Sequence, residues 1–344
     1  MAFCFSDEII NWYIKGHRDF PWRHTKDPYY IWISEIMLQQ TRAETVVSYY
    51  NRFTASFPNV FELAKSDEET LLKAWEGLGY YSRAKNLKKC AQIIVERYDG
   101  SFPSEYGALL QLPGIGPYTA GAIASIAFDN REPAVDGNVL RVMSRFYGIE
   151  EDIHEKKTQD GIRRRVYDLL PEQHCDLFSN AMMEIGACIC TPKIAKCQEC
   201  PLNEECVARI EEKQTILPVK NHKIEKRKEK KEILLIFSQN KVYIEKREKG
   251  LLSGLYGFPE FNGPMSPDEI EFKTEQLGIN AKYLEQIGMT KHVFTHVIWE
   301  MRIHVMYCRD EKVLTGFVNR SELLKVPIPM AFRKARQLCL ARMK

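Results

Sequence analysis

Apolar residues recur at three- and four-residue intervals through most of the first 210 residues. This spacing places them on one face of an α-helix, and Pro, Gly and Asp residues separate the successive runs. The clearest predicted helices cover residues 7–17, 31–41, 69–79, 82–98 and 141–149. Strict alternation of apolar and polar residues, the mark of a half-buried strand, is nearly absent. We therefore expect a mainly α N-terminal domain over residues 1–210.

The pattern changes near residue 230, where strand signals begin. Apolar runs and alternating stretches predict strands at residues 232–237, 241–247, 297–308 and 314–319. One helical stretch, residues 267–278, lies between them. We predict a second domain of α+β type over residues 232–344.

A basic stretch separates the two regions. Residues 219–231 hold seven Lys or Arg against two Glu and almost nothing to bury, so residues 211–231 are predicted to form a linker. This segment is either a solvated connection or one that also runs along a DNA backbone. The net charge of the whole chain is only +3, so an interaction with nucleic acid would depend on local patches of this kind.

The longest uncharged run, residues 106–128, is long enough to span a bilayer, but Pro113, Gly114, Gly116 and Pro117 interrupt it. We expect two helices around a turn instead. The first ten residues have no basic region followed by an apolar one, so no signal peptide is predicted. These features indicate a soluble protein without a membrane partner, and we expect a cytoplasmic location.

Five of the ten cysteines lie within residues 188–206, which favours metal binding over disulfides. Cys190, Cys197, Cys200 and Cys206 have the spacing C-x6-C-x2-C-x5-C. Four thiolates this close together suit either tetrahedral zinc or a [4Fe-4S] cluster. The compact, uneven spacing favours the [4Fe-4S] cluster, because zinc ribbons usually pair two C-x2-C knuckles. Cys188 falls outside the spacing and is expected to pack against its neighbours.

The turn at residues 112–117 reads hydrophobic-Pro-Gly-hydrophobic-Gly-Pro, the pattern of a helix–hairpin–helix. Gly114 and Gly116 would let backbone N–H groups approach a phosphate at the start of the next helix, where the dipole favours an anion. Such a turn holds DNA without reading its sequence. The alternative is a plain connection between two helices.

Two carboxylates have unusual surroundings. Glu35 lies on an apolar stripe with Ile31, Trp32 and Leu38, so it is either a stray surface residue or a buried acid with a raised pKa. Asp136 precedes a predicted helix, where an aspartate is ordinarily an N-cap. A neutral acid beside an ionised carboxylate is the arrangement that cleavage of a glycosidic bond needs.

An ordered set of motifs extends over nearly the whole chain. It comprises residues 18–23, 31–46, 75–87, 112–128, 135–142, the four cysteines, and residues 246–260 and 292–297 of the second domain. This set resembles the MutY-type adenine DNA glycosylases of the helix–hairpin–helix superfamily, which carry a Nudix-like C-terminal domain. The resemblance implies a monomeric base-excision-repair enzyme that acts on double-stranded DNA and is associated with the nucleoid.

The resemblance also implies a substrate and a set of roles. Adenine mispaired with 8-oxoguanine, and also with guanine, would be flipped into a pocket and hydrolysed. Glu35 would protonate adenine N7, and Asp136 would stabilise the oxocarbenium-like sugar electrostatically or by transient covalent attack, with Asn138 and Tyr118 in support. The adenine pocket would be lined by Trp22, Arg23 and Asn180.

Further matching positions imply contacts to DNA. Those that would wedge into the duplex and hold the base opposite adenine are Gln40, Thr41, Leu78 and Tyr80. The loop of Phe294, Thr295 and His296 would recognise 8-oxoguanine, although Thr295 stands where serine is common in the family. His296 could instead be an ordinary histidine at the end of a strand.

The related endonuclease III branch has a lysine where this chain has Tyr118, and that lysine forms a Schiff base with the sugar. No lysine occurs between Lys89 and Lys156, so a monofunctional glycosylase without strand cleavage is expected. Tyr118 could also serve as an aromatic lid. The acidic set of a working Nudix hydrolase is missing from residues 271–278, so hydrolysis of free nucleotides is not expected.

Two alternative functions remain at this point. One is a sister glycosylase that removes thymine from T:G mismatches or an oxidised pyrimidine; such relatives generally end near the cysteine cluster. The other is a damage reader without activity, for which loss of Glu35 or Asp136 would be expected. Both carboxylates are present.

Overall fold

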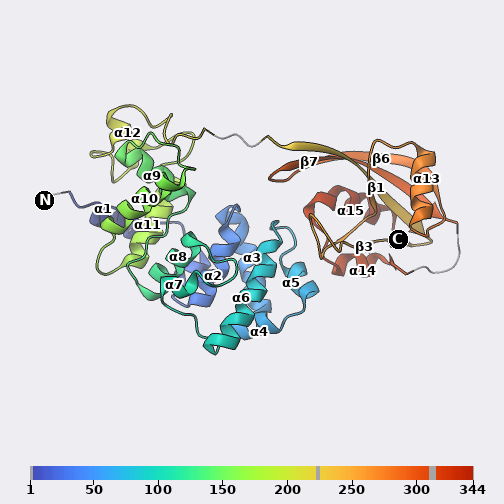
Figure 1. Ribbon diagram of the computed structural model, residues 1–344, viewed down its shortest axis with the longest axis horizontal. Helices are drawn as coiled ribbons and strands as arrows, with labels where there is room; N and C mark the ends of the chain where they lie inside the picture. Colours follow the sequence, from blue (N-terminus) through green and yellow to red (C-terminus); the bar gives the residue numbers. More distant parts are fainter. Residues whose placement is uncertain (1–2, 222–224, 310–314, 344) are drawn as a thin grey trace. The chain divides into compact units, whose positions relative to one another are not determined.

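The computed structural model describes residues 3–221, 225–309 and 315–343. The chain forms two compact units (Figure 1). The helical unit comprises Met1–Lys65 and Lys85–Lys223, and the mixed unit comprises Ser66–Ala84 and Ile224–Lys344. The fold class is the one expected, a mainly α unit followed by an α+β unit.

The helical unit consists of α-helices and short 3₁₀-helices. They are α1 (Phe5–Lys15), η1 (Pro21–His24), α2 (Pro28–Leu38), α3 (Ala43–Ser56), α4 (Val60–Lys65), α6 (Ser82–Tyr98, mostly in this unit), α7 (Tyr106–Leu109), α8 (Pro117–Phe128), α9 (Gly137–Tyr147), α10 (Lys156–Leu169), α11 (Cys175–Cys188), η2 (Cys197–Glu199) and α12 (Val207–Ile210). Among the described residues, no helix is long and apolar enough to span a membrane.

Helix α2 lies in the interior of this unit. Asp27 is its N-cap and accepts a hydrogen bond from the Tyr29 N–H, while Pro28 occupies the first turn, where a missing N–H costs nothing. Eight of its eleven residues are buried, including Glu35 at 3% exposure. The apolar stripe in the sequence therefore carries a carboxyl group into the core, and Glu35 is not a surface residue.

The uncharged run folds as predicted, into α7 and α8 around a turn. Gly114 has φ +80°, and a Cβ there would lie 2.8 Å from Asn86 Cβ, so the turn requires glycine. Gly116 is the N-cap of α8, and Pro117 follows in the first turn. Inside α8, a Cβ on Gly121 would lie 2.3 Å from the Pro133 carbonyl oxygen. These close approaches explain the small residues in the motif.

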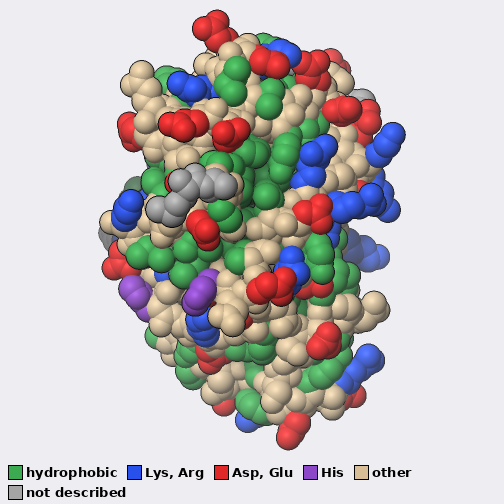
Figure 2. Space-filling view, turned by 90° about the vertical axis from the view of Figure 1, so that its left-hand side faces the viewer, with side chains coloured by type: hydrophobic (Ala, Val, Ile, Leu, Met, Phe, Trp, Pro, Cys, Tyr) green, Lys and Arg blue, Asp and Glu red, His purple; other side chains and the backbone are tan. Residues whose placement is uncertain are grey.

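Helices α1, α9, α10 and α11 share a second core, which contains Phe5, Ile9, Met143 and Phe178 and borders the cysteine loop. The side of the molecule that carries α1 and α12 is drawn in Figure 2. Acidic and basic side chains are intermixed there around hydrophobic ones, in keeping with the nearly balanced net charge.

The mixed unit contains one six-stranded sheet, a small two-stranded sheet and four α-helices within the described residues. Its elements are α5 (Glu68–Ala74), β1 (Arg227–Ser238), β2 (Lys241–Tyr243), β3 (Glu245–Lys246), β4 (Tyr256–Gly257), β5 (Glu260–Asn262), α13 (Pro267–Gln276), β6 (Ala281–Val293), β7 (Val297–Cys308), β8 (Phe317–Val318), α14 (Arg320–Lys325), η3 (Met330–Phe332) and α15 (Arg333–Arg342).

The large sheet has the order β6-β7-β1-β2-β8, and β5 also pairs with β1. The central pair, β1 and β7, is parallel, whereas β6 and β7 form a long antiparallel hairpin. One face of the sheet packs on α14, η3 and α15, and the other packs on α13. Because both faces are covered over the middle of β1, residues 233–237 form a continuous apolar run.

Two sequence expectations need correction in this unit. Strand β1 begins at Arg227, inside the predicted linker, because Arg227–Phe237 pairs residue by residue with Val297–Tyr307. The predicted strand at 241–247 is divided into β2 and β3. Residue 314, where the last predicted strand was to start, lies outside the described residues, and β8 covers only Phe317–Val318.

The segment Ser66–Ala84 belongs to the mixed unit through several polar contacts. The Arg336 guanidinium forms an ion pair with Glu76 and donates to the Leu323 carbonyl oxygen at 3.0 Å. Lys73 pairs with Glu76 as well and donates to the Val326 carbonyl oxygen at 3.1 Å. This segment ends in the loop that carries Leu78 and Tyr80.

Candidate active site

Glu35 and Tyr118 form a buried pair in the helical unit. The Tyr118 hydroxyl donates a hydrogen bond to Glu35 Oε2 and lies 3.2 Å from Met183 Sδ. Burial raises the pKa of Glu35 to about 7, the hydrogen bond from Tyr118 opposes this, and the negative charge of Asp136 raises the pKa further. Glu35 can therefore hold a proton near neutral pH.

Asp136 is the N-cap of α9. Its Oδ1 accepts hydrogen bonds at 2.8 Å from the N–H groups of Asn138 and Val139, and its Oδ2 accepts one at 2.8 Å from Asn138 Nδ2. Burial raises the pKa of Asp136, whereas these hydrogen bonds lower it. The N-cap interpretation is thus correct, and the same side chain influences the charge of Glu35.

Arg141 connects this carboxylate to the cysteine loop. Its Nη2 donates to Asn138 Oδ1 at 2.9 Å and to the Gly186 carbonyl oxygen at 2.7 Å. Its Nε donates to the Cys190 carbonyl oxygen at 2.7 Å. The hydrogen-bond series Asp136–Asn138–Arg141–Cys190 therefore fixes the Asn138 amide, and through it the Asp136 carboxylate.

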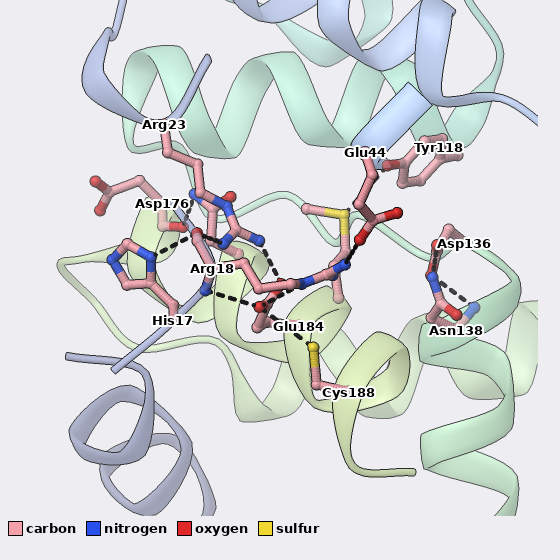
Figure 3. Close-up of polar contacts among 12 residues, drawn as sticks. His17, Arg18, Arg23, Glu44, Tyr118, Asp136, Asn138, Asp176, Glu184 and Cys188 are labelled. Carbon is pink, nitrogen blue, oxygen red and sulfur yellow. Dashed lines mark hydrogen bonds and ion pairs between the residues drawn. The ribbon is translucent and has the colours of Figure 1, made fainter. Parts of the chain in front are cut away.

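Glu184, on α11, forms the charged centre of a second group (Figure 3). Arg18 donates to both of its oxygens, at 2.9 and 3.0 Å, and Arg23 Nη2 lies 2.6 Å from Oε2. Burial raises the pKa of Glu184, but the hydrogen bonds from Arg18 and Arg23 outweigh it and lower the pKa to about 2. Glu184 is consequently ionised, and it orients Arg23.

Sequence reasoning did not identify Glu184, Arg18 or Arg141. Glu184 carries the signal that identified Glu35, a single acid on an apolar helical face, here beside Ala181 and Ile185. A cation far away in the sequence, such as Arg18, has no local signal.

The other predicted pocket residues lie close to this group. Trp22 is 7% exposed and stacks on Phe20 at 4.9 Å between ring centroids, and Arg23 lies over the same Phe20 ring at 5.1 Å. Asn180 donates from Nδ2 to the Asp176 carbonyl oxygen of its own helix at 2.9 Å.

A close backbone approach holds α11 against the start of α9. A Cβ on Gly186 would lie 2.5 Å from Asn138 Cβ and 3.2 Å from its backbone. We expect Gly186→Ala to cost about 1–3 kcal/mol of folding free energy and to reduce activity, because Asn138 must move. Thermal unfolding and single-turnover kinetics measure both effects. Gly161→Ala, where no atom lies within 4 Å, is the matched control, and equal behaviour of the two variants would contradict this account.

The four predicted metal ligands line a single cavity. Cys190, Cys197, Cys200 and Cys206 face it together with Ile189 and Ala195, among others. In the described part of the chain, no three His, Cys, Asp or Glu side chains converge closely enough to hold one metal ion. Four thiols that face one cavity supply the donor set that an iron–sulfur cluster requires. Arg145 Nη1, 3.3 Å from Cys190 Sγ, supplies a positive charge beside them.

In the mixed unit, the loop of Phe294, Thr295 and His296 joins β6 to β7. The Phe294 ring packs edge-on against Trp299 at 4.9 Å, and the His296 carbonyl oxygen accepts from the Arg227 N–H at 3.0 Å. Thr295 Oγ1 lies 3.1 Å from the Tyr80 hydroxyl, so two predicted DNA-contacting residues meet.

The remaining predicted residues differ in exposure. Tyr80 is 45% exposed with φ +49°, whereas Leu78 is buried at 6% exposure. Gln40 has φ +58° in the turn after α2, and Thr41 Oγ1 bonds only locally, to the Gln39 carbonyl oxygen. In α13, Glu269 closes a capping box with Ser266, which gives this acid a structural role.

Known proteins resemble this chain in both of its regions. Residues 33–167 match the HhH-GPD superfamily of base excision DNA repair proteins, and residues 232–338 match the NUDIX domain. An adenine DNA glycosylase of Buchnera aphidicola (Acyrthosiphon pisum strain) is 38% identical over 86% of this chain and 84% of its own. The human adenine DNA glycosylase is 38% identical over 62% of this chain and 41% of its own.

Among solved structures, a thermostable thymine-DNA glycosylase aligns with a TM-score of 0.56 at 31% identity, covering 60% of this chain and 95% of that one. An endonuclease III–DNA complex aligns with a TM-score of 0.52 at 21% identity, over 60% of this chain and 94% of that one, and it shows the shared fold. The relatives that extend through both regions of the chain are DNA glycosylases of base excision repair. On this similarity, the chain belongs to the adenine DNA glycosylase family.

Proposed function

We propose that this DNA glycosylase hydrolyses the N-glycosidic bond of adenine paired with 8-oxoguanine, and more slowly with guanine. The observation that carries the proposal is Glu35, a buried acid with a pKa of about 7 whose charge is coupled to that of Asp136. One carboxyl group can give a proton while the other stabilises positive charge. Adenine must leave the duplex to reach them.

The reaction proceeds by acid-assisted departure of the base. Glu35 transfers its proton to adenine N7 while the C1′–N9 bond breaks and its electron pair leaves with the base. The sugar becomes an oxocarbenium ion, which the Asp136 carboxylate stabilises. Water then adds to C1′ and gives up a proton to the Glu35 carboxylate, which restores the acid and leaves an abasic site.

Supporting residues hold these groups in place. The Tyr118 hydroxyl fixes one Glu35 oxygen, which leaves the other free to face the base. Asn138 fixes Asp136 and is itself held by Arg141. Trp22, Arg23 and Asn180 line the adenine pocket, and Glu184 holds the Arg23 guanidinium.

Tyr118 supports a monofunctional reaction. A phenol cannot form a Schiff base with the abasic sugar, so the strand should stay intact. We expect the protein to produce strand breaks only after alkali treatment and no borohydride-trapped adduct with DNA. Denaturing gels with and without alkali measure this, and a break without alkali would contradict the assignment.

We assign recognition of the opposite base to the mixed unit. Thr295, with Phe294 and His296 beside it, would contact 8-oxoguanine, and Tyr80 would wedge next to that base. Gln40, Thr41 and Leu78 complete the contacts to the duplex, although Leu78 must become exposed to take part. Gly114 and Gly116 present backbone N–H groups to a phosphate.

We also propose that Cys190, Cys197, Cys200 and Cys206 bind a [4Fe-4S] cluster. The cluster orders the loop that includes Cys190, to which Arg141 is anchored. Cys200→Ser is expected to remove most of the bound iron and acid-labile sulfide and to lower thermal stability. Iron and sulfide analysis of the purified protein measures this, with Cys175→Ser as a control outside the cavity. Full iron content in the Cys200 variant would refute the ligand assignment.

Single-turnover base release tests the substrate. We expect the order A:8-oxoguanine, then A:G, with no release from T:G or A:T. Release of thymine from T:G instead would favour the activity named for the thymine-DNA glycosylase that aligns with 60% of this chain.

A further inference from the structure

The basic stretch of the sequence has a use beyond that of a linker. Its last five residues form the beginning of β1, so their side chains alternate between the two faces of the sheet. Arg227, Glu229 and Lys231 lie on one face, and Lys228 and Lys230 lie on the other.

The cations of the first face already have partners. Arg227 pairs with Glu229 at 2.5 Å. Lys231 lies 3.4 Å from Glu260 and 5.0 Å above the Trp299 ring. These charges are used within the unit.

The lysines of the second face lack such partners among the described residues. In the strand register, Lys230 lies opposite Glu300 of β7, and Glu300 lies opposite Lys291 of β6. We call Lys228, Lys230 and Lys291 the lysine face. All three are exposed, and none forms an ion pair with any residue that the structure describes.

The neighbouring charges leave this face positive. In the next row, Arg302 donates from Nε to Glu232 Oε2 at 2.9 Å and from Nη2 to Oε1 at 2.6 Å, and that pair is neutral. Glu300 is the remaining acid, set against three lysines.

A groove opens on this face because α13 covers only the other half of the sheet, where it packs on Leu234, Ile236 and Met306. The groove is lined mainly by residues of three strands, and the charged ones are Lys230, Lys231, Lys291, Arg302, Glu232 and Glu300.

The lysine face is also continuous with the loop of Phe294, Thr295 and His296. Lys228 lies in the row of Ile298 and Val293, directly before that loop. Lys228 and Lys230 are about 7 Å apart along the strand, and Lys230 and Lys291 are about 10 Å apart across two strand spacings.

We propose that the lysine face binds backbone phosphates of duplex DNA next to the base that the loop reads. Three unpaired lysines, of which Lys230 and Lys291 line an open groove, complement a polyanion, and their spacing spans several phosphates of one strand. This inference rests on the proposed function, since it places the DNA by the recognition loop. An acidic protein segment is the competing occupant.

The test measures the affinity for a duplex with one A:8-oxoguanine pair as a function of salt, by fluorescence anisotropy. Changing Lys228, Lys230 and Lys291 together to Gln should reduce the slope of log affinity against log salt by about 0.9 per lysine. The control changes the exposed Lys282, Lys325 and Lys334 to Gln, with the same loss of charge. A third variant has Arg at the three positions of the lysine face and should keep the slope.

The rate of adenine release at saturating protein should stay unchanged in the lysine-face variant. Three results would overturn the inference: an unchanged slope in the lysine-face variant, an equal slope change in the control, or loss of slope in the Arg variant. An unchanged slope is expected if the lysine face binds protein instead. If the unaltered chain binds with the predicted slopes but releases no adenine, the proposed function fails and the phosphate contact stands.

Discussion

Changing Asp136 to Asn is expected to lower the single-turnover rate of adenine release by at least about 10³-fold while the protein stays folded. In the proposed mechanism this carboxylate is the negative charge that faces the developing oxocarbenium ion. Loss of even one preorganised hydrogen-bond donor at such a site costs about 10²–10³-fold. Asn is nearly as good an N-cap as Asp, so α9 should still begin at Gly137.

A matched control separates catalysis from capping. Asp27 caps α2 through a 2.8 Å hydrogen bond from the Tyr29 N–H, and Asp27→Asn makes the same chemical change there. This variant should release adenine at nearly the unaltered rate. If Asp136→Asn loses less than tenfold, or if both variants lose activity equally, Asp136 is not the stabilising carboxylate.

Changing Glu35 to Gln is expected to slow adenine release by about 10²–10⁴-fold, the usual contribution of a general acid. The unaltered protein should lose rate as the pH rises above about 7, because Glu35, whose pKa is raised to about 7, then loses its proton. The Gln variant should lack this limb of the pH profile. A variant that keeps the same limb would show that another group donates the proton.

Stability provides a second measurement for Glu35. Its pKa is higher in the folded protein than the ordinary carboxyl value of 4.5, so its ionisation destabilises the fold as the pH rises from 4.5 through 7. Gln cannot ionise and accepts the same hydrogen bond from Tyr118. We therefore expect Glu35→Gln to be at least as stable as the unaltered protein at pH 8, measured by denaturant unfolding. Lower stability of the variant at pH 8 would show that ionisation of Glu35 does not destabilise the folded protein.

Helices with a strong apolar period could be predicted closely from the sequence, and α6 matches its predicted range of residues 82–98. Strand β6 was missed because its side chains do not alternate regularly. It is an edge strand, mostly exposed, with two register shifts, near Tyr283/Glu285 and Gln286/Gly288. Its pairing with β7 fixes its structure, and nothing local signals that pairing.

The prediction of where β1 starts was wrong for a related reason. All five residues from 227 to 231 are charged, and composition alone indicates a linker. These residues form a strand because they pair with β7 and because Lys231 forms salt bridges with Glu229 and Glu260. Tertiary context thus overrides the local preference.

The candidate site was more predictable than its surroundings. Glu35 stands out because an acid is unusual on an apolar helix. Asp136 stands out because an aspartate is favoured at the start of a helix. The arginines that orient the site were missed, since Arg18 meets Glu184 across 166 residues. The damage-reader and nucleotide-hydrolase alternatives find no support, because both carboxyl groups are present, Glu35 buried and Asp136 partly buried, and the family is that of adenine DNA glycosylases.

The most direct test of the central claim is the amount of free adenine released in a single turnover from a duplex with one A:8-oxoguanine pair. It should be measured for the unaltered protein and the Glu35→Gln and Asp136→Asn variants. We predict one adenine per duplex from the unaltered protein, with a strand break only after alkali, and almost none from either variant. No adenine from the unaltered protein, or equal release from all three, would contradict the account.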